Sequence, residues 1–220
     1  MTDTSFLEEK RQVTFDWHIT QVLKWLKYDK GRKLDSVIVY ASLELRCAIE
    51  RYLLELLYLL KDIKLTPDDK RRCRSKNGIL ELMKETEPDY IKRAKFTNLI
   101  ASITPEIPKV VIVDIKYLVR MWNTISNYCH KQLRPEESFD SVNRDFQEKG
   151  SKIINEVVNK FKEWESKGAF GITNKESMPS EVRSIYEKYI KDEIDEGRAK
   201  RMLKLMEPVL RRRLGNYFMR

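Results

Sequence analysis

The stretch "YASLELRCAIERYLLELL", Tyr40 to Leu57, decides the fold class of this chain. Its aliphatic residues recur every three or four positions, which is the period of an amphipathic helix and not the two-residue period of a strand. Glu55 interrupts the most apolar part, "YLLELLYLL", so the run lacks the apolar length that crossing a bilayer requires. We therefore expect a long helix over about residues 34–61, the most apolar in the chain.

The same helical period governs nearly every other segment. Further helices are predicted over about residues 5–28, 66–87, 88–103, 109–132, 134–167, 179–195 and 198–217. The run "VVIVDI" from Val110 to Ile115 has enough β-branched residues for a strand. Because the helical period continues through Trp122 and a lone strand would have no partner, we expect it to be helical. The sequence predicts an all-α fold, a bundle of about five to six helices with a C-terminal helical appendage.

Two short segments punctuate this pattern. In "LTPDDK", Thr66 is expected to cap a helix whose first residue is Pro67, since this proline suits the first helical position. The segment "KGAFGITNKESMPS" is the clearest linker, with two glycines and a proline that can start a helix. The predicted domains are a bundle over residues 1–167, a linker over 168–177 and a basic helical hairpin over 178–220.

The residue composition excludes several kinds of functional site. The cysteines Cys47, Cys73 and Cys129 form no CxxC pair, and the only histidines are His18 and His130. We therefore expect neither a zinc site nor a disulfide framework, and no metal or cofactor. No glycine-rich phosphate loop is present, and no secretory signal or membrane span is visible, so a cytoplasmic protein is expected.

Two of the predicted helices carry a polar stripe. On the first, the stripe consists of Ser42, Arg46 and Glu50. On the second, "LVRMWNTISNYCH" from Leu118 to His130, it consists of Asn123, Ser126, Asn127 and His130. The members of each stripe are three or four residues apart and so share one helical face. We expect the stripes to face each other, although His130 alone also fits a histidine that interacts with the end of its helix.

The segments "SLELRCAIERYLLELL" and "LVRMWNTISNYCHKQL" resemble the two core helices of the HEPN superfamily, the higher eukaryotes and prokaryotes nucleotide-binding domain. The likeness covers about residues 34–132. It implies a small helical bundle, often dimeric. Many members are metal-independent ribonucleases of toxin–antitoxin or phage-defence systems, and others bind nucleotides or serve as interaction modules.

The resemblance carries over to one catalytic residue. Catalytic members have an arginine separated from the histidine by four to six intervening residues, and the corresponding positions before His130 hold Asn123, Thr124 and Ile125. We expect His130 to transfer protons, since an imidazole titrates near neutral pH. A guanidinium from Arg46, or from Arg120 as second choice, would hold phosphate, and Asn123 and Asn127 would orient the substrate.

The formal net charge of +9 favours an anionic partner, nucleic acid before membrane. The basic candidates are Lys70, Arg71, Arg72, Arg74, Arg211, Arg212 and Arg213, although such a run is often only a solvated helix face. The prediction is an RNA-directed protein that either binds RNA or cuts it as a metal-independent endoribonuclease. A second copy of the chain, in a homodimer, and a protein antagonist or regulator are the further predicted partners. The alternative is a non-catalytic interaction or regulatory module whose polar stripes form a dimer interface.

Overall fold

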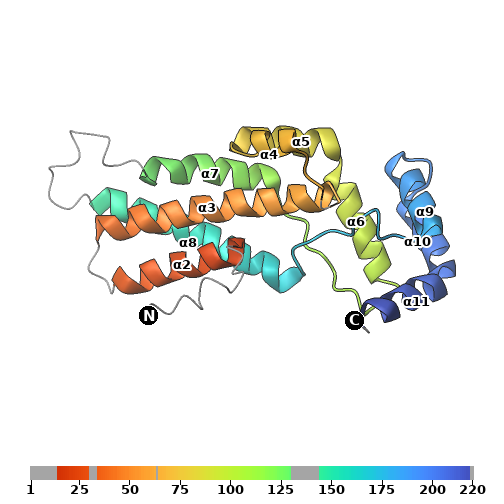
Figure 1. Cartoon of the computed structure of the whole chain (residues 1–220). Coiled ribbons are helices and arrows are strands. Elements are labelled where there is room, and N and C mark those ends of the chain that lie inside the picture. Colours follow the sequence, from red (N-terminus) through yellow and green to blue (C-terminus); the bar gives the residue numbers. More distant parts are fainter. Residues whose placement is uncertain (1–13, 30–33, 63, 130–143, 219–220) are drawn as a thin grey trace, which may run out of the picture. The chain divides into compact units, whose positions relative to one another are not determined.

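The computed structural model consists of helices and describes residues 14–29, 34–62, 64–129 and 144–218 (Figure 1). The helices of this described part are α2 (Phe15–Asp29), α3 (Asp35–Leu60), α4 (Pro67–Arg72), α5 (Lys76–Thr86), α6 (Tyr90–Ala101), α7 (Ile115–Cys129), α8 (Arg144–Lys167), α9 (Ser180–Ile190), α10 (Glu196–Leu205) and α11 (Glu207–Phe218). The β-type pairing within the described residues is limited to one isolated bridge between Val110 and Ala169. The predicted all-α fold class is confirmed.

The chain divides into two compact units. The first combines Met1–Tyr52 with Ile115–Asn159, and the second combines Leu53–Asp114 with Lys160–Arg220. The divisions fall inside α3, after Tyr52, and inside α8, after Asn159. These boundaries differ from the sequence-based ones, which assigned residues 1–167 to one domain and 178–220 to an appendage.

In the first unit, α3 supplies the central apolar face. Its buried residues are Val37, Ile38, Ala41, Leu45, Ala48, Ile49 and Tyr52. The ring of Phe15 on α2 meets the ring of Tyr52 edge-on, with centroids 5.4 Å apart. On α8, a Cβ built at Gly150 would lie 2.5 Å from Cγ2 of Ile38 and 3.2 Å from the ring of Tyr128. The missing side chain of Gly150 therefore permits the close approach of α8 to α3 and α7.

In the second unit, α6 packs against the C-terminal helices. Their shared core contains Phe96, Leu99, Ile100 and Ile103 on one side, and Met178, Val182, Ile185, Tyr186, Tyr189, Ile194, Ala199, Leu203 and Leu210 on the other. Phe96 contacts the rings of Tyr186 and Tyr189 at centroid distances of 5.2 and 5.8 Å. The predicted hairpin thus shares its core with α6, which is why the units do not follow the predicted boundary.

Segment 168–177 is also tied to this unit. The backbone N–H of Thr173 donates to Oγ1 of Thr97 at 3.1 Å, and Arg93 Nη2 donates to the Thr173 carbonyl at 2.9 Å. The backbone N–H of Lys175 donates to Asp62 Oδ1 at 2.9 Å. Because its backbone groups bond to buried or partly buried side chains of this unit, this segment does not have the structure of a free linker.

The predicted helix over 66–87 is divided into α4 and α5. Its start is as expected, with a reciprocal capping box between Thr66 and Asp69 and Pro67 in the first turn. A second start follows at Ser75, whose hydroxyl accepts from the backbone N–H of Gly78 at 3.1 Å. The predicted helix over 198–217 is likewise divided, at Met206, into α10 and α11.

The prediction that "VVIVDI" is helical is wrong, because α7 begins only at Ile115. The side chain of Asn98 bonds to both backbone groups of Val110, at 2.8 Å to the N–H and 2.9 Å to the carbonyl. Ala169 forms a bridge with the same run. The side-chain amide of Asn98 and the carbonyl of Ala169 therefore satisfy backbone groups of Val110 and Val111 that would otherwise need a neighbouring strand.

Candidate nucleic-acid interface

Three side chains of the first unit form a connected group where α3 meets α7. The Cζ of Arg46 lies 4.7 Å from the centroid of the Trp122 ring, in a cation–π contact. Glu50 Oε1 accepts from Arg46 Nε at 3.2 Å and from the indole N–H of Trp122 at 2.8 Å. The guanidinium is therefore fixed from two directions, by a ring face and by a carboxylate.

The Arg46 side chain keeps part of its binding capacity. Its Nη1 and Nη2 make no hydrogen bond to any residue that the structure describes, and 28% of the side chain is exposed. A guanidinium presents its N–H groups in a planar fork that matches two oxygens of a phosphate or carboxylate. The group thus presents an oriented fork at the surface of the unit.

The asparagines of the second stripe lie on the exposed side of α7. Asn123 and Asn127 are exposed, whereas Arg46 and Glu50 contact Trp122, a residue outside the predicted stripe. His130, the predicted proton-transfer residue, lies outside the described residues. The asparagine side chains are therefore accessible to a ligand in the same helix that supplies Trp122.

The supporting members of the stripes differ in surroundings. Ser42 is fully buried on α3, and its hydroxyl has no hydrogen-bond partner among the described residues. The hydroxyl of Ser126 donates to the carbonyl of Trp122 within α7 at 2.7 Å. Arg120 is exposed, and its Cζ lies 5.5 Å from the ring centroid of Tyr117. Ser42 and Ser126 consequently belong to helix packing, and Arg120 points to solvent.

The surroundings of two cysteines near this group, Cys47 and Cys129, raise the pKa values of their thiols. Burial raises the pKa of Cys47, and the carboxylates of Glu50 and Glu44 raise it further. Burial also raises the pKa of the Cys129 thiol, although the charge of Arg46 opposes this. Because the thiolate is the nucleophilic form, neither cysteine is activated for covalent catalysis.

The predicted basic residues of α4 and of the turn that follows it lie in the second unit, and two of them are already paired. Arg71 bonds to Asp68 at 2.5 Å, and Arg72 bonds to Glu85 at 2.7 Å. Lys70 and Arg74 are exposed and form no ion pair within the described part of the chain. These two remain the stronger candidates for phosphate contact.

In the C-terminal basic run, Arg211 to Arg213, one arginine is likewise paired with acidic side chains of the chain. Arg211 pairs with Glu207 at 2.9 Å and with Glu106 at 2.5 Å. Arg212 is exposed, and the side chain of Arg213 lies outside the described part. Intramolecular pairing thus uses part of the positive charge that the sequence displays.

Sequence reasoning missed a histidine–carboxylate pair in the first unit. His18 Nδ1 on α2 and Glu44 Oε2 on α3 are 2.7 Å apart, and both side chains are largely buried. No signal within either helix predicts this pair, because it requires the relative placement of α2 and α3. It ties the two helices together.

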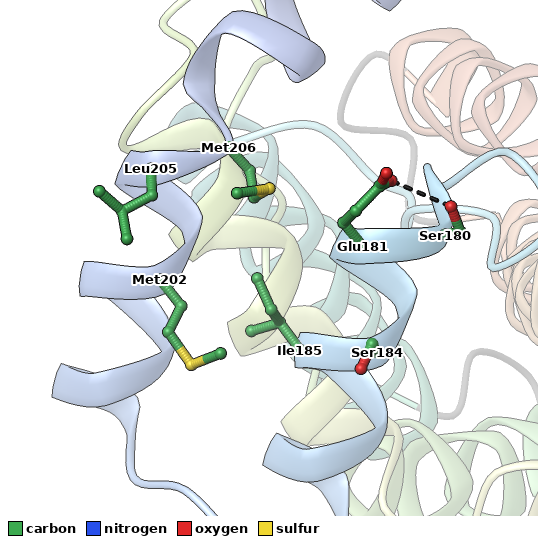
Figure 2. A pocket seen from close by; sticks show the side chains of 7 residues that line it. All are labelled: Ser180, Glu181, Ser184, Ile185, Met202, Leu205 and Met206. Atoms are coloured by element: carbon green, nitrogen blue, oxygen red, sulfur yellow. Dashed lines mark hydrogen bonds between the residues drawn. The ribbon is translucent and has the colours of Figure 1, made fainter.

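A groove in the second unit has a mainly apolar lining with one titratable side chain. Figure 2 shows its lining by Ser180, Glu181, Ser184, Ile185, Met202, Leu205 and Met206, and its volume is about 490 Å³. The titratable group in this lining, Glu181, accepts from the hydroxyl of Ser180 at 3.0 Å. Its own backbone N–H and this hydroxyl lower the pKa of Glu181. The methionine and leucine side chains favour an apolar contact.

Comparison of the chain with protein-family models, curated proteins and solved structures found no match. Within the described ranges, no group of three or more histidine, cysteine or acidic residues has an arrangement that could hold a metal ion. Among the described helices, none has both the length and the apolar content that crossing a membrane requires.

Proposed function

We propose that this chain is a HEPN-like RNA-binding protein and that the α3–α7 surface around Arg46 holds the RNA backbone. The observation that carries the proposal is the guanidinium fixed by Trp122 and Glu50, whose Nη1 and Nη2 bond to no described residue. An arginine held in this way loses little side-chain entropy when it binds a phosphate.

Two further features support an RNA ligand. Asn123 and Asn127 expose amide groups on α7, and amides both donate and accept hydrogen bonds to sugars and base edges. The net charge of +9 supplies the long-range attraction to a polyanion. Binding should therefore weaken as the salt concentration rises.

The binding proposal is tested with labelled single-stranded RNA over a range of salt concentrations. Arg46→Gln removes the charge and the fork, so we expect about a tenfold loss of affinity, the value of one charge-assisted contact. The matched control is Lys152→Gln, an exposed residue on α8 of the same unit, which should change affinity by no more than about twofold. Equal losses in the two variants would show that only net charge matters and would contradict the assignment of Arg46.

The catalytic form of the proposal is metal-independent cleavage of RNA. The ribose 2′-oxygen attacks the adjacent phosphorus as the bond to the 5′-oxygen breaks, leaving a cyclic phosphate and a 5′-hydroxyl. His130 transfers a proton, and with a second copy of the chain one His130 takes the 2′-proton while the other protonates the leaving oxygen. Arg46 offsets the negative charge that develops on the phosphorane oxygens.

The cleavage assay is run in EDTA with wild type, His130→Ala and His18→Gln. We expect cleavage by wild type, loss of activity in His130→Ala and retention in His18→Gln, because His18 is occupied by Glu44. The His130→Ala variant should still bind RNA. Undiminished cleavage by His130→Ala would refute the catalytic role of this histidine.

The second candidate is the non-catalytic interaction module. It is favoured by Tyr40 and Leu43, which neighbour each other on the outer side of α3 with 47% and 45% of their surfaces exposed, since contiguous exposed apolar surface often marks a protein interface. In this form the polar stripes of two copies meet. Sedimentation of wild type and Leu43→Glu tests it: a dimer that Leu43→Glu dissociates, in a chain that binds no RNA, favours the module.

A further inference from the structure

Three aromatic side chains of the first unit form a cluster, which we name the aromatic platform: Trp25 and Tyr28 on α2, and Tyr40 on α3. The rings of Trp25 and Tyr40 are stacked, with centroids 4.8 Å apart and planes inclined by 19°. Tyr28 meets Trp25 edge-on at 6.2 Å. Although Trp25 covers one ring face of Tyr40, 47% of Tyr40 is exposed, as is 56% of Tyr28. Ring surface therefore remains for another flat group.

A slanted row of side chains on α3 connects the aromatic platform with Arg46. Tyr40, Leu43 and Arg46 follow one another at three-residue spacing on α3, so each neighbours the next on the helix surface, while Tyr40 and Arg46 lie roughly 120° apart around the helix axis. Tyr40 and Leu43 are exposed and Arg46 is partly exposed, while Leu45 and Ile49 point into the core. Six residues of helix correspond to roughly 9 Å along the axis. An extended ligand of several nucleotides that wraps around the exposed side of α3 can therefore contact both Tyr40 and Arg46.

Positive charge lies beside the aromatic platform on α2. Lys24 precedes Tyr28 by four residues and so neighbours it on the helix surface. Lys24 and Lys27 are exposed and form no ion pair within the described residues. Aromatic surface flanked by unpaired lysines is the combination that single-stranded nucleic acids bind, through base stacking and backbone neutralisation.

We propose that the aromatic platform stacks the bases of single-stranded RNA whose backbone Lys24 and Arg46 hold. This inference rests on the proposed RNA binding and names its ligand class. The bases of a duplex are stacked on each other and cannot spread over Tyr40, whereas unpaired bases can. The platform therefore selects single-stranded over double-stranded RNA.

The test measures binding of the full chain to one oligoribonucleotide that carries 2-aminopurine, as a single strand and as a duplex. We expect the single strand to bind more tightly and its fluorescence to be quenched by stacking. Tyr40→Ala should weaken single-strand binding by roughly 5- to 100-fold, the range for loss of one stacked base. Tyr40→Phe, which keeps the ring, should stay within about twofold. Tyr58→Ala is the matched control, because Tyr58 is a tyrosine of the same helix that is 42% exposed and does not belong to the aromatic platform.

The outcomes separate this inference from the proposed function. RNA binding with equal affinity for both forms, or unchanged in Tyr40→Ala, overturns the aromatic platform and leaves the role of Arg46 standing. No RNA binding by wild type overturns both. A Tyr40→Ala chain that binds RNA normally but loses self-association identifies the cluster as a protein contact and overturns the inference. If Tyr40→Ala does not fold, Tyr28→Ala decides in its place.

Discussion

Two arginines, Arg46 and Arg93, show how differently one residue type is used in the two units. Arg46 is partly exposed with an open fork, whereas Arg93 on α6 is fully buried. Arg93 pairs with Asp62 at 2.9 Å and Glu87 at 3.5 Å, and it also donates to backbone carbonyls. Glu87 also forms an ion pair with Lys175 at 2.7 Å. A buried charge needs such partners, so Arg93 is structural and Arg46 remains available to a ligand.

Replacement of Arg93 should be severely destabilising. Arg93→Met leaves Asp62 without its ion-pair partner and breaks the bonds to segment 168–177, so we expect a loss of about 3–5 kcal/mol in the free energy of unfolding. The matched control is Lys95→Met, an exposed residue on the same helix, with an expected change within about 0.5 kcal/mol. Urea denaturation followed by circular dichroism measures both. Similar midpoints for the two variants would contradict the structural role of Arg93.

Tyr186 belongs to the same buried network. Its hydroxyl donates to Glu87 Oε2 at 3.0 Å, and burial followed by the nearby Glu87 charge raises the pKa of Tyr186 well above its ordinary value. The phenol therefore stays protonated and keeps its role as a donor throughout the neutral range. Neither Arg93 nor Tyr186 stood out in the sequence, because partners 31 and 99 residues away supply the burial and the bonds.

At the scale of elements, the periodicity and capping residues of the sequence predicted where helices lie better than where each helix begins and ends. The Thr66–Pro67 start was predicted because a cap involves only neighbouring residues. The extended run after Pro108 was not, because Asn98 and Ala169 bind its backbone from distant positions. The extended backbone agrees with the β-branched residues of this run, whereas the helical period through Trp122 applies only from Ile115 onward.

Helix packing in the first unit provides a test at this scale. In Gly150→Ala the new methyl group would meet Cγ2 of Ile38, which a β-branched side chain cannot easily move, and the ring of Tyr128. We expect a net destabilisation of roughly 1–2 kcal/mol, although alanine is the better helix former. Gly197→Ala on α10 is the control: its methyl group would have ordinary contacts, so it should be neutral or slightly stabilising. Thermal unfolding of both variants decides, and a stabilised Gly150→Ala would refute the close approach.

At the scale of the whole molecule, the decisive feature is the core that α6 shares with the C-terminal helices. A core of this kind makes residues 178–220 part of a cooperative unit. A fragment containing residues 1–167 would leave Phe96 and Ile100 without the side chains that cover them. We therefore place the boundary between folding units elsewhere than at the glycine-containing segment.

A pair of leucines on α10 tests this organisation. Leu203 is fully buried in the shared core, while Leu205 is 75% exposed at the groove. Leu203→Ala should lower the free energy of unfolding by about 2–5 kcal/mol, and Leu205→Ala should change it by less than about 0.5 kcal/mol. Chemical denaturation of the full chain measures the difference. Equal and small effects would mean that the C-terminal helices fold as a separate appendage.

The sequence by itself determined the all-α class, the course of the long helices and the polar residues on their surfaces, because these follow from local periodicity and local capping. Only the tertiary structure decided which helices share a core, that Trp122 and Glu50 hold Arg46, and that Trp25 and Tyr40 stack. Contacts of this kind join residues on different helices, and periodicity within one helix carries no information about the rotation and register of its neighbour.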